Sequence, residues 1–158
     1  MAVFTAAEAL EMAMEIEKSG EAFYKAVAAQ SSDQPLKALF EDLAAQEQGH
    51  YRVFQSMAGN VEAPAPLPAP EYNEYRLYLQ AALDNALFAG EDKALALARK
   101  ARDRETALRA ALGFEKDTLI FFYDLRDMVG ETDRETVSNV IREEKKHLRL
   151  LAGLLQQS

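Results

Sequence analysis

The chain has 158 residues, of which 49% are hydrophobic and 28% charged, with only 7 Gly and 5 Pro. This composition is typical of one folded, helix-rich domain and excludes a disordered or fibrous chain. The net charge of −8 argues against nucleic-acid or anionic-membrane partners, and the absence of cysteine excludes disulfides, thiolate nucleophiles and iron–sulfur centres. No stretch has the 18 or so apolar residues of a membrane span, and the N-terminus has no signal-peptide pattern, so we expect a cytoplasmic protein.

Start and stop signals for helices divide the chain into four long segments. The start signals are two capping boxes and one capping aspartate followed by proline: Thr5 with Glu8, Thr132 with Glu135, and Asp33 with Pro35. The stop signals are glycines that follow periodic apolar stretches: Gly59, Gly90 and Gly130. Together they predict helices over about 6–30, 34–58 and 132–157, and another that ends near residue 129.

The connection between the second and third long helices is unusually long, covering about 60–102. Four of the five prolines fall between Pro64 and Pro70, so we expect an extended connector there. Residues 71–89 have the pattern of an extra helix, which packs on its own bundle or across a dimer. A further helical stretch from 92 either leads into the third long helix or breaks near Asp103. The sequence therefore predicts a single all-α domain, 1–158, a four-helix bundle with one long crossover containing an extra helix.

The chain has only two histidines, and each ends a Glu-x-x-His motif: Glu47 with His50, and Glu144 with His147. Residues three apart share one face of a helix, so each pair can present a carboxylate and an imidazole to one point. Glu17 stands 30 residues before Glu47, and Glu115 stands 29 residues before Glu144. This correspondence indicates two repeated helical hairpins.

These six residues lie at predicted core positions, because the residues seven before and after each of them are apolar or aromatic, as Phe40 and Phe54 are around Glu47. The four glutamates also lie at similar distances from their helix–helix turns, near the middle of the bundle. Four buried carboxylates would repel one another unless neutralised, and two divalent cations supply that compensation. Carboxylates combined with imidazoles favour iron or manganese over calcium.

With these six residues in this order, and Tyr24 seven residues after Glu17, the chain resembles the rubrerythrin-like branch of the ferritin-like superfamily over almost its whole length. The resemblance implies two Fe ions per chain, with Mn or Zn as substitutes. It implies that Glu47 and Glu144 bridge the ions, that Glu17 and Glu115 are terminal ligands, and that each histidine binds one ion. Tyr24 is either a plain core aromatic or a residue that hydrogen-bonds a ligand and protects the site.

The resemblance also implies a reaction with hydrogen peroxide or dioxygen. Full-length rubrerythrins carry a Cys-rich rubredoxin domain, which is not found here, so we expect an external electron donor. Thr118 stands where rubrerythrin proper offers a further Glu ligand. The alternatives are a ferroxidase with Fe²⁺ as substrate, a non-catalytic bundle stabilised by metal, and solvated surface pairs. Glu21 and Glu143 compete with Glu17 and Glu144 as ligands, and we expect a homodimer or a higher homo-oligomer.

Overall fold

The computed structural model describes residues 6–60 and 90–157, so Thr5, the prolines from Pro64 to Pro70 and the helix predicted over 71–89 lie outside the described residues. All regular structure in the described part is helical, which confirms the predicted all-α class. The helices are α1 (Ala6–Gln30), α2 (Gln34–Ala58), α4 (Glu91–Lys100), α5 (Arg104–Met128) and α6 (Glu131–Gln156). None of the described helices is long and apolar enough to span a membrane.

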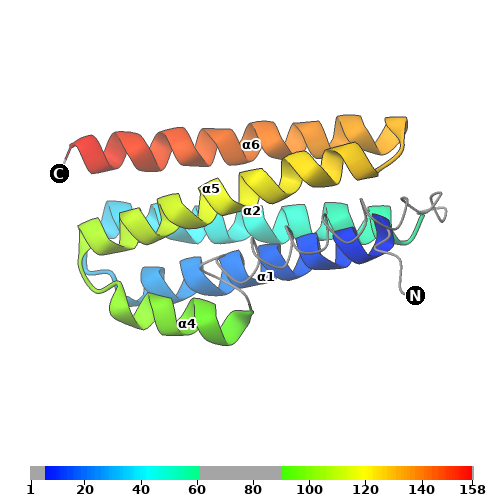
Figure 1. Ribbon diagram of the computed structural model, residues 1–158. Helices are drawn as coiled ribbons and strands as arrows, with labels where there is room; N and C mark the ends of the chain where they lie inside the picture. The colour runs from blue at the N-terminus through cyan, green and yellow to red at the C-terminus, as the bar shows by residue number, and fades with distance from the viewer. Residues whose placement is uncertain (1–5, 61–89, 158) are drawn as a thin grey trace, which may run out of the picture.

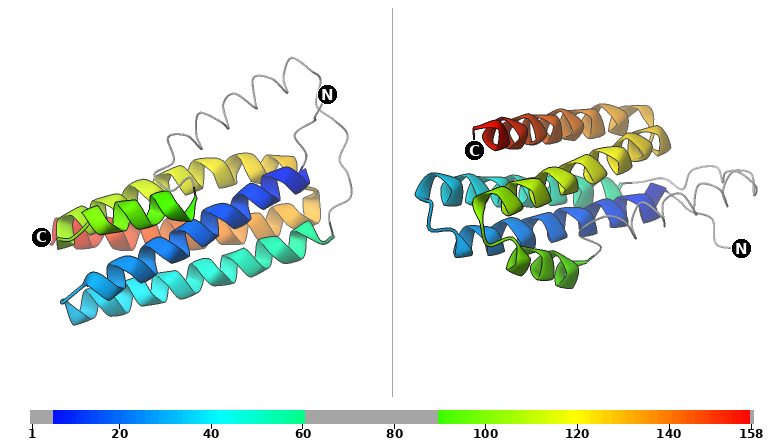
Figure 2. Two further views of the ribbon diagram at one scale, coloured as in Figure 1. Left: turned by 90° about the horizontal axis from the view of Figure 1, so that it is seen from below. Right: turned by 60° about the vertical axis from the view of Figure 1, so that its left-hand side comes forward.

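The four long helices form two antiparallel hairpins that pack side by side, α1 with α2 and α5 with α6 (Figures 1 and 2). The shorter α4 lies against α1. Because α2 ends at one end of the bundle and α5 begins at the other, the chain between them must return the full length of the bundle (Figure 1). This arrangement confirms the predicted topology with one long crossover.

Local capping explains where two of the long helices begin. The Asp33 side chain accepts a hydrogen bond from the backbone N–H of Leu36 (3.2 Å), and Pro35 lies in the first turn of α2, as predicted. The Asp103 side chain accepts a hydrogen bond from the N–H of Thr106 (2.8 Å) and so starts α5. The helical stretch from 91 is therefore separate from α5, and of the two alternatives the break near Asp103 is confirmed.

The predicted capping box at Thr132 is wrong. The helix α6 begins one residue earlier, at Glu131, with the extended backbone of Gly130 at the N-cap position and no side-chain cap. Thr132 is therefore already helical, and its hydroxyl cannot reach the free N–H groups of the first turn. Two acids in that turn, Glu131 and Asp133, interact favourably with the positive end of the helix dipole instead.

The inward stripes of the four long helices form one apolar core, and its largest fully buried side chains include Tyr24, Phe40, Phe54 and Phe122. The residues at heptad spacing from the six candidates are buried as predicted, except Leu154, which is half-buried. Within this core lie eight buried polar or charged side chains, namely the six candidates together with Ser19 and Thr118. The apolar scaffold therefore encloses a polar centre.

Candidate metal centre

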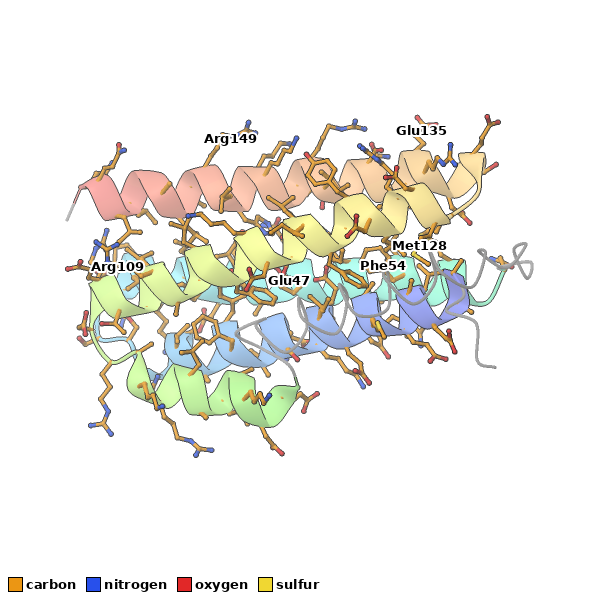
Figure 3. The ribbon with its side chains drawn as sticks, viewed as in Figure 1. Glu47, Phe54, Arg109, Met128, Glu135 and Arg149 are labelled. Atoms are coloured by element: carbon orange, nitrogen blue, oxygen red, sulfur yellow. The ribbon has the colours of Figure 1, made fainter. Side chains whose placement is uncertain are left out.

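All six predicted side chains converge in the interior, from four different helices. The α1 helix contributes Glu17, α2 contributes Glu47 and His50, α5 contributes Glu115, and α6 contributes Glu144 and His147. None of the six is more than 4% exposed. Figure 3 shows Glu47 about half-way along the bundle, which agrees with the depth expected from the helix lengths. The reading of these residues as solvated surface pairs is therefore wrong.

The six side chains form two overlapping sets. In each set the potential ligand atoms lie within 4.8 Å of one another: Glu17, Glu47, His50 and Glu144 in the first, and Glu47, Glu115, Glu144 and His147 in the second. Glu47 and Glu144 belong to both sets. Two cations could thus be held side by side, with these two carboxylates shared between them.

Glu144 lies between the two histidines. Its Oε1 is 2.9 Å from Nδ1 of His50, and its Oε2 is 3.1 Å from Nδ1 of His147. The two imidazole rings lie 6.0 Å apart between centroids and are inclined by only 26°. Both rings therefore direct Nδ1 toward the same carboxylate and Nε2 away from it.

The remaining carboxylates have unused acceptor capacity. Both oxygens of Glu17, both oxygens of Glu47 and Oε2 of Glu115 are buried without a hydrogen-bond partner in the described part of the chain. Buried polar atoms in native proteins are almost always satisfied, because an unsatisfied one costs about 1–3 kcal/mol. Five unsatisfied oxygens around two imidazoles are a donor set that fits a pair of divalent cations.

Without a cation, burial makes the ionised form of these carboxyls unfavourable. Burial, followed by repulsion from Glu144, raises the pKa of Glu17, Glu47 and Glu115 well above the ordinary value of 4.5. Burial alone would also raise the pKa of Glu144, but hydrogen bonds with Glu115 and both histidines lower it below its usual range. Glu144 is therefore the most readily ionised of the four carboxyls in the metal-free protein.

The carboxylate of Glu144 affects both histidines. Burial alone would lower the pKa of His50, but its hydrogen bond to Glu144 and the negative charge there raise the pKa to about 10. Burial also acts to lower the pKa of His147, and its hydrogen bonds with Glu115 and Glu144 raise it to about 10. Both imidazoles are therefore cationic near neutral pH in the metal-free protein.

The outer nitrogens of the histidines contact residues on the other hairpin. Nε2 of His50 lies 2.5 Å from Oε2 of Glu143, and Nε2 of His147 lies 2.7 Å from Oε1 of Gln46. Glu143 thus contacts a candidate ligand from outside and belongs to neither ligand set, whereas Glu21 pairs with Lys25 at 2.6 Å. The sequence analysis missed Gln46, although it directly precedes Glu47 as Glu143 precedes Glu144.

Tyr24 has a polar partner within the site. Its ring is fully buried and stacks on Phe40, and its hydroxyl donates a hydrogen bond of 2.6 Å to Oε1 of Glu115. Burial and the neighbouring Glu115 raise the pKa of Tyr24 well above 10.0, so the hydroxyl keeps its proton. Of the two sequence-based interpretations, this contact favours a role in holding a ligand over that of a plain core aromatic.

Gly20 lies where two components of the site meet. A Cβ at this position would lie 2.7 Å from the ring of Phe114 and 3.3 Å from Oε2 of Glu47. Only glycine therefore lets the Phe114 ring and the Glu47 carboxylate approach α1 this closely. Gly49, also in the middle of a helix, has no neighbour within 4 Å of such a Cβ.

Thr118 is buried one turn after Glu115, and its hydroxyl has no hydrogen-bond acceptor or donor within the described residues. It gives the second ligand set a polar neighbour but no carboxylate. The position therefore departs from the further Glu ligand expected in rubrerythrin proper.

Comparison with known proteins agrees with this arrangement. The Rubrerythrin family model matches residues 8–155. The chain belongs to the rubrerythrin family. A solved structure from Thermotoga maritima, described as a ferritin-like diiron-carboxylate protein, has the same fold with a TM-score of 0.70 at 23% sequence identity, covering 99% of this chain and 97% of that one. No curated protein matches the sequence significantly. Membership of the rubrerythrin family and the buried cluster are together compatible with iron binding.

Proposed function

We propose that the chain holds two iron ions among the six buried side chains and uses them, with an external electron donor, to reduce hydrogen peroxide or dioxygen. The observation that supports this proposal is the pair of overlapping ligand sets that share Glu47 and Glu144. A single cation would need only one of these sets. Two sets with unsatisfied oxygens fit a dinuclear site, in which each ion could supply one electron of a two-electron reduction.

Each of the six residues would have a particular role in binding the two ions. Glu47 and Glu144 would bridge the pair, Glu17 and Glu115 would each complete one side, and each histidine would bind one ion through Nδ1, the nitrogen that faces Glu144. Reduction of one peroxide to two waters takes two electrons and two protons, and a pair of Fe²⁺ ions held by these residues would supply one electron each. An external donor would restore Fe²⁺, since a chain without cysteine cannot hold a cysteine-ligated iron centre.

The residues around the ligands would keep bulk water out and hold one ligand in place. The buried ring of Tyr24 packs against those of Phe40 from α2 and Phe114 from α5, and together these rings would exclude bulk water around Glu115. Tyr24 would keep its proton and hold Oε1 of Glu115, which leaves the other oxygen of that carboxylate available for an ion.

Elemental analysis of the protein loaded with Fe²⁺ without oxygen tests the binding step. We expect about two iron ions per chain, and a loss of both in the double variant Glu47→Ala with His147→Ala. Glu135→Ala is the matched control, since Glu135 lies on the outer face of the same helix as His147 (Figure 3). Unchanged iron content in the double variant would refute the assignment of the site.

Stopped-flow mixing tests the reaction. Oxidation of the loaded protein by peroxide much faster than by dioxygen would support a peroxidase. Repeated turnover of excess Fe²⁺ would support a ferroxidase instead, with Fe²⁺ as the substrate. If neither oxidant changes the absorption of the loaded protein, both redox proposals fail and a metal-stabilised bundle is left.

A further inference from the structure

The outer hydrogen bonds of the two histidines follow the internal repeat of the chain but differ in chemistry. Glu143 directly precedes Glu144 and contacts Nε2 of His50, while Gln46 directly precedes Glu47 and contacts Nε2 of His147. Both contacts cross from one hairpin to the other. Equivalent positions thus hold the two imidazoles, one through a carboxylate and the other through a neutral amide.

The amide contact has a fixed orientation. The Gln46 side chain donates from Nε2 to Oδ2 of Asp42 at 2.7 Å, which leaves Oε1 as the atom that accepts from His147. Whenever Nδ1 of a histidine binds an ion, Nε2 carries the proton and donates it to the outer partner. His50 would then donate to a negative charge and His147 to a neutral carbonyl.

The terminal carboxylates of the two ligand sets also differ in their hydrogen bonding. Tyr24 donates a hydrogen bond to Glu115, the terminal carboxylate of the His147 set, while neither oxygen of Glu17 has a hydrogen-bond donor among the described residues. A donated hydrogen bond withdraws electron density from a carboxylate, and a carboxylate partner increases the basicity of an imidazole. Glu17 and His50 are therefore the stronger ligands of the two terminal pairs.

On the basis of the metal pair proposed above, we propose that Glu143 and Gln46 are unequal positioning residues that make the two metal positions different. The position formed by Glu17, His50 and the shared carboxylates, the His50 position, binds a divalent cation more tightly and fills first. The position formed by Glu115, His147 and the same shared carboxylates, the His147 position, fills second.

Titration of the metal-free protein with Co²⁺, followed by calorimetry and by visible absorption, measures the two stepwise constants without any enzymatic turnover. We expect Glu143→Gln to weaken the first step about tenfold or more and to leave the second within about twofold, the size typical of lost outer partners of a ligand. Glu135→Gln removes one charge from the outer face of α6 and serves as the matched control. This control should leave both constants unchanged.

A variant with exchanged outer partners, the exchange variant, tests whether the charge of the partner of each histidine, and not damage to the structure, causes the difference between the two positions. It combines Glu143→Gln with Gln46→Glu and Asp42→Asn, the last because a carboxylate at position 42 would repel a new one at position 46. We expect this variant to recover a wide separation between the two constants, with the His147 position now filling first. A subsequent His50→Ala substitution in this variant should then remove the weaker step, whereas in the original chain it should remove the stronger one.

The outcomes distinguish this inference from the proposed function. If the original chain binds no Co²⁺, the metal site itself is refuted. If the chain binds two ions but Glu143→Gln leaves the first constant within about twofold, or weakens only the second, the inference is overturned while the metal site stands. An exchange variant that binds two ions with no wider separation than Glu143→Gln also overturns it.

Discussion

Loading the metal-free protein with two divalent cations at pH 7 should release more than two protons per chain. Burial and repulsion from Glu144 raise the pKa values of Glu17, Glu47 and Glu115 well above 4.5, and any proton that these carboxyls hold must leave before they bind a cation. Two further protons come from the imidazoles, whose pKa values lie at about 10. Glu144 contributes none, because its pKa is lowered and it is already ionised.

The same six residues with ordinary pKa values would behave very differently. Their carboxyls would already be ionised at pH 7, and two histidines with a pKa near 6.5 would carry together only about half a proton. A release of more than two protons, against about half a proton, therefore separates the buried cluster from a solvated one. Four carboxylates and two divalent cations sum to zero charge in the loaded protein.

Stopped-flow mixing with Co²⁺ in weakly buffered solution containing a pH indicator measures this number. Calorimetry in two buffers of different ionisation enthalpy provides an independent value. The double variant Glu47→Ala with His147→Ala, which should bind no metal pair, controls for protons released by surface binding. A release of two protons or fewer per chain, in a protein that binds two ions, would refute the inference that burial keeps the carboxyls partly protonated, because the two histidines alone account for two.

Three further predictions concern the stability of the metal-free protein, and thermal unfolding checks each of them. Gly20→Ala should lower the free energy of unfolding by about 1–3 kcal/mol, since Phe114 or a ligand must move. Gly49→Ala should raise the free energy of unfolding by about 1 kcal/mol, which corresponds to a Tm increase of about 2–4 °C, and equal effects of the two substitutions would contradict the packing argument. Tyr24→Phe should cost about 1–3 kcal/mol by removing the hydroxyl that donates to Oε1 of Glu115, and unchanged stability would contradict this role. The two imidazoles stabilise the fold fully below their unfolded pKa of 6.5 and lose that contribution as pH rises through about 10, so Tm should fall across this range, and a constant Tm would contradict the raised pKa values.

The elements and the buried ligands could be predicted from the sequence because both depend on one helix at a time. Apolar residues seven apart define which face of a helix is buried, and a glutamate within that series, such as Glu47 between Phe40 and Phe54, is buried by its neighbours. The sequence left open whether the helix breaks before α5, since Asp103 can either cap a new helix or lie within a continuous one. The N-cap predicted at Thr132 was displaced by two residues, because a capping-box pattern does not exclude an N-cap at Gly130.

The contacts around the ligands could not be predicted, because they depend on how the two hairpins are rotated against each other. Gln46 and Glu143 reach the histidines only across the interface between α2 and α6. Gly20 could be recognised as costly within a helix, but the sequence does not show that Phe114, nearly a hundred residues later, occupies the space beside it. The internal repeat was the one signal that could have paired Gln46 with Glu143.

Several polar contacts of the centre connect one hairpin to the other. His50 of the first hairpin contacts Glu143 and Glu144 of the second, and His147 of the second contacts Gln46 of the first. Buried ionic clusters of this kind are often no more stable than apolar residues of the same volume, so stability gives no reason for six polar side chains at the middle of the bundle. Their cost is offset when cations replace the protons of the cluster, which couples hairpin docking to metal loading.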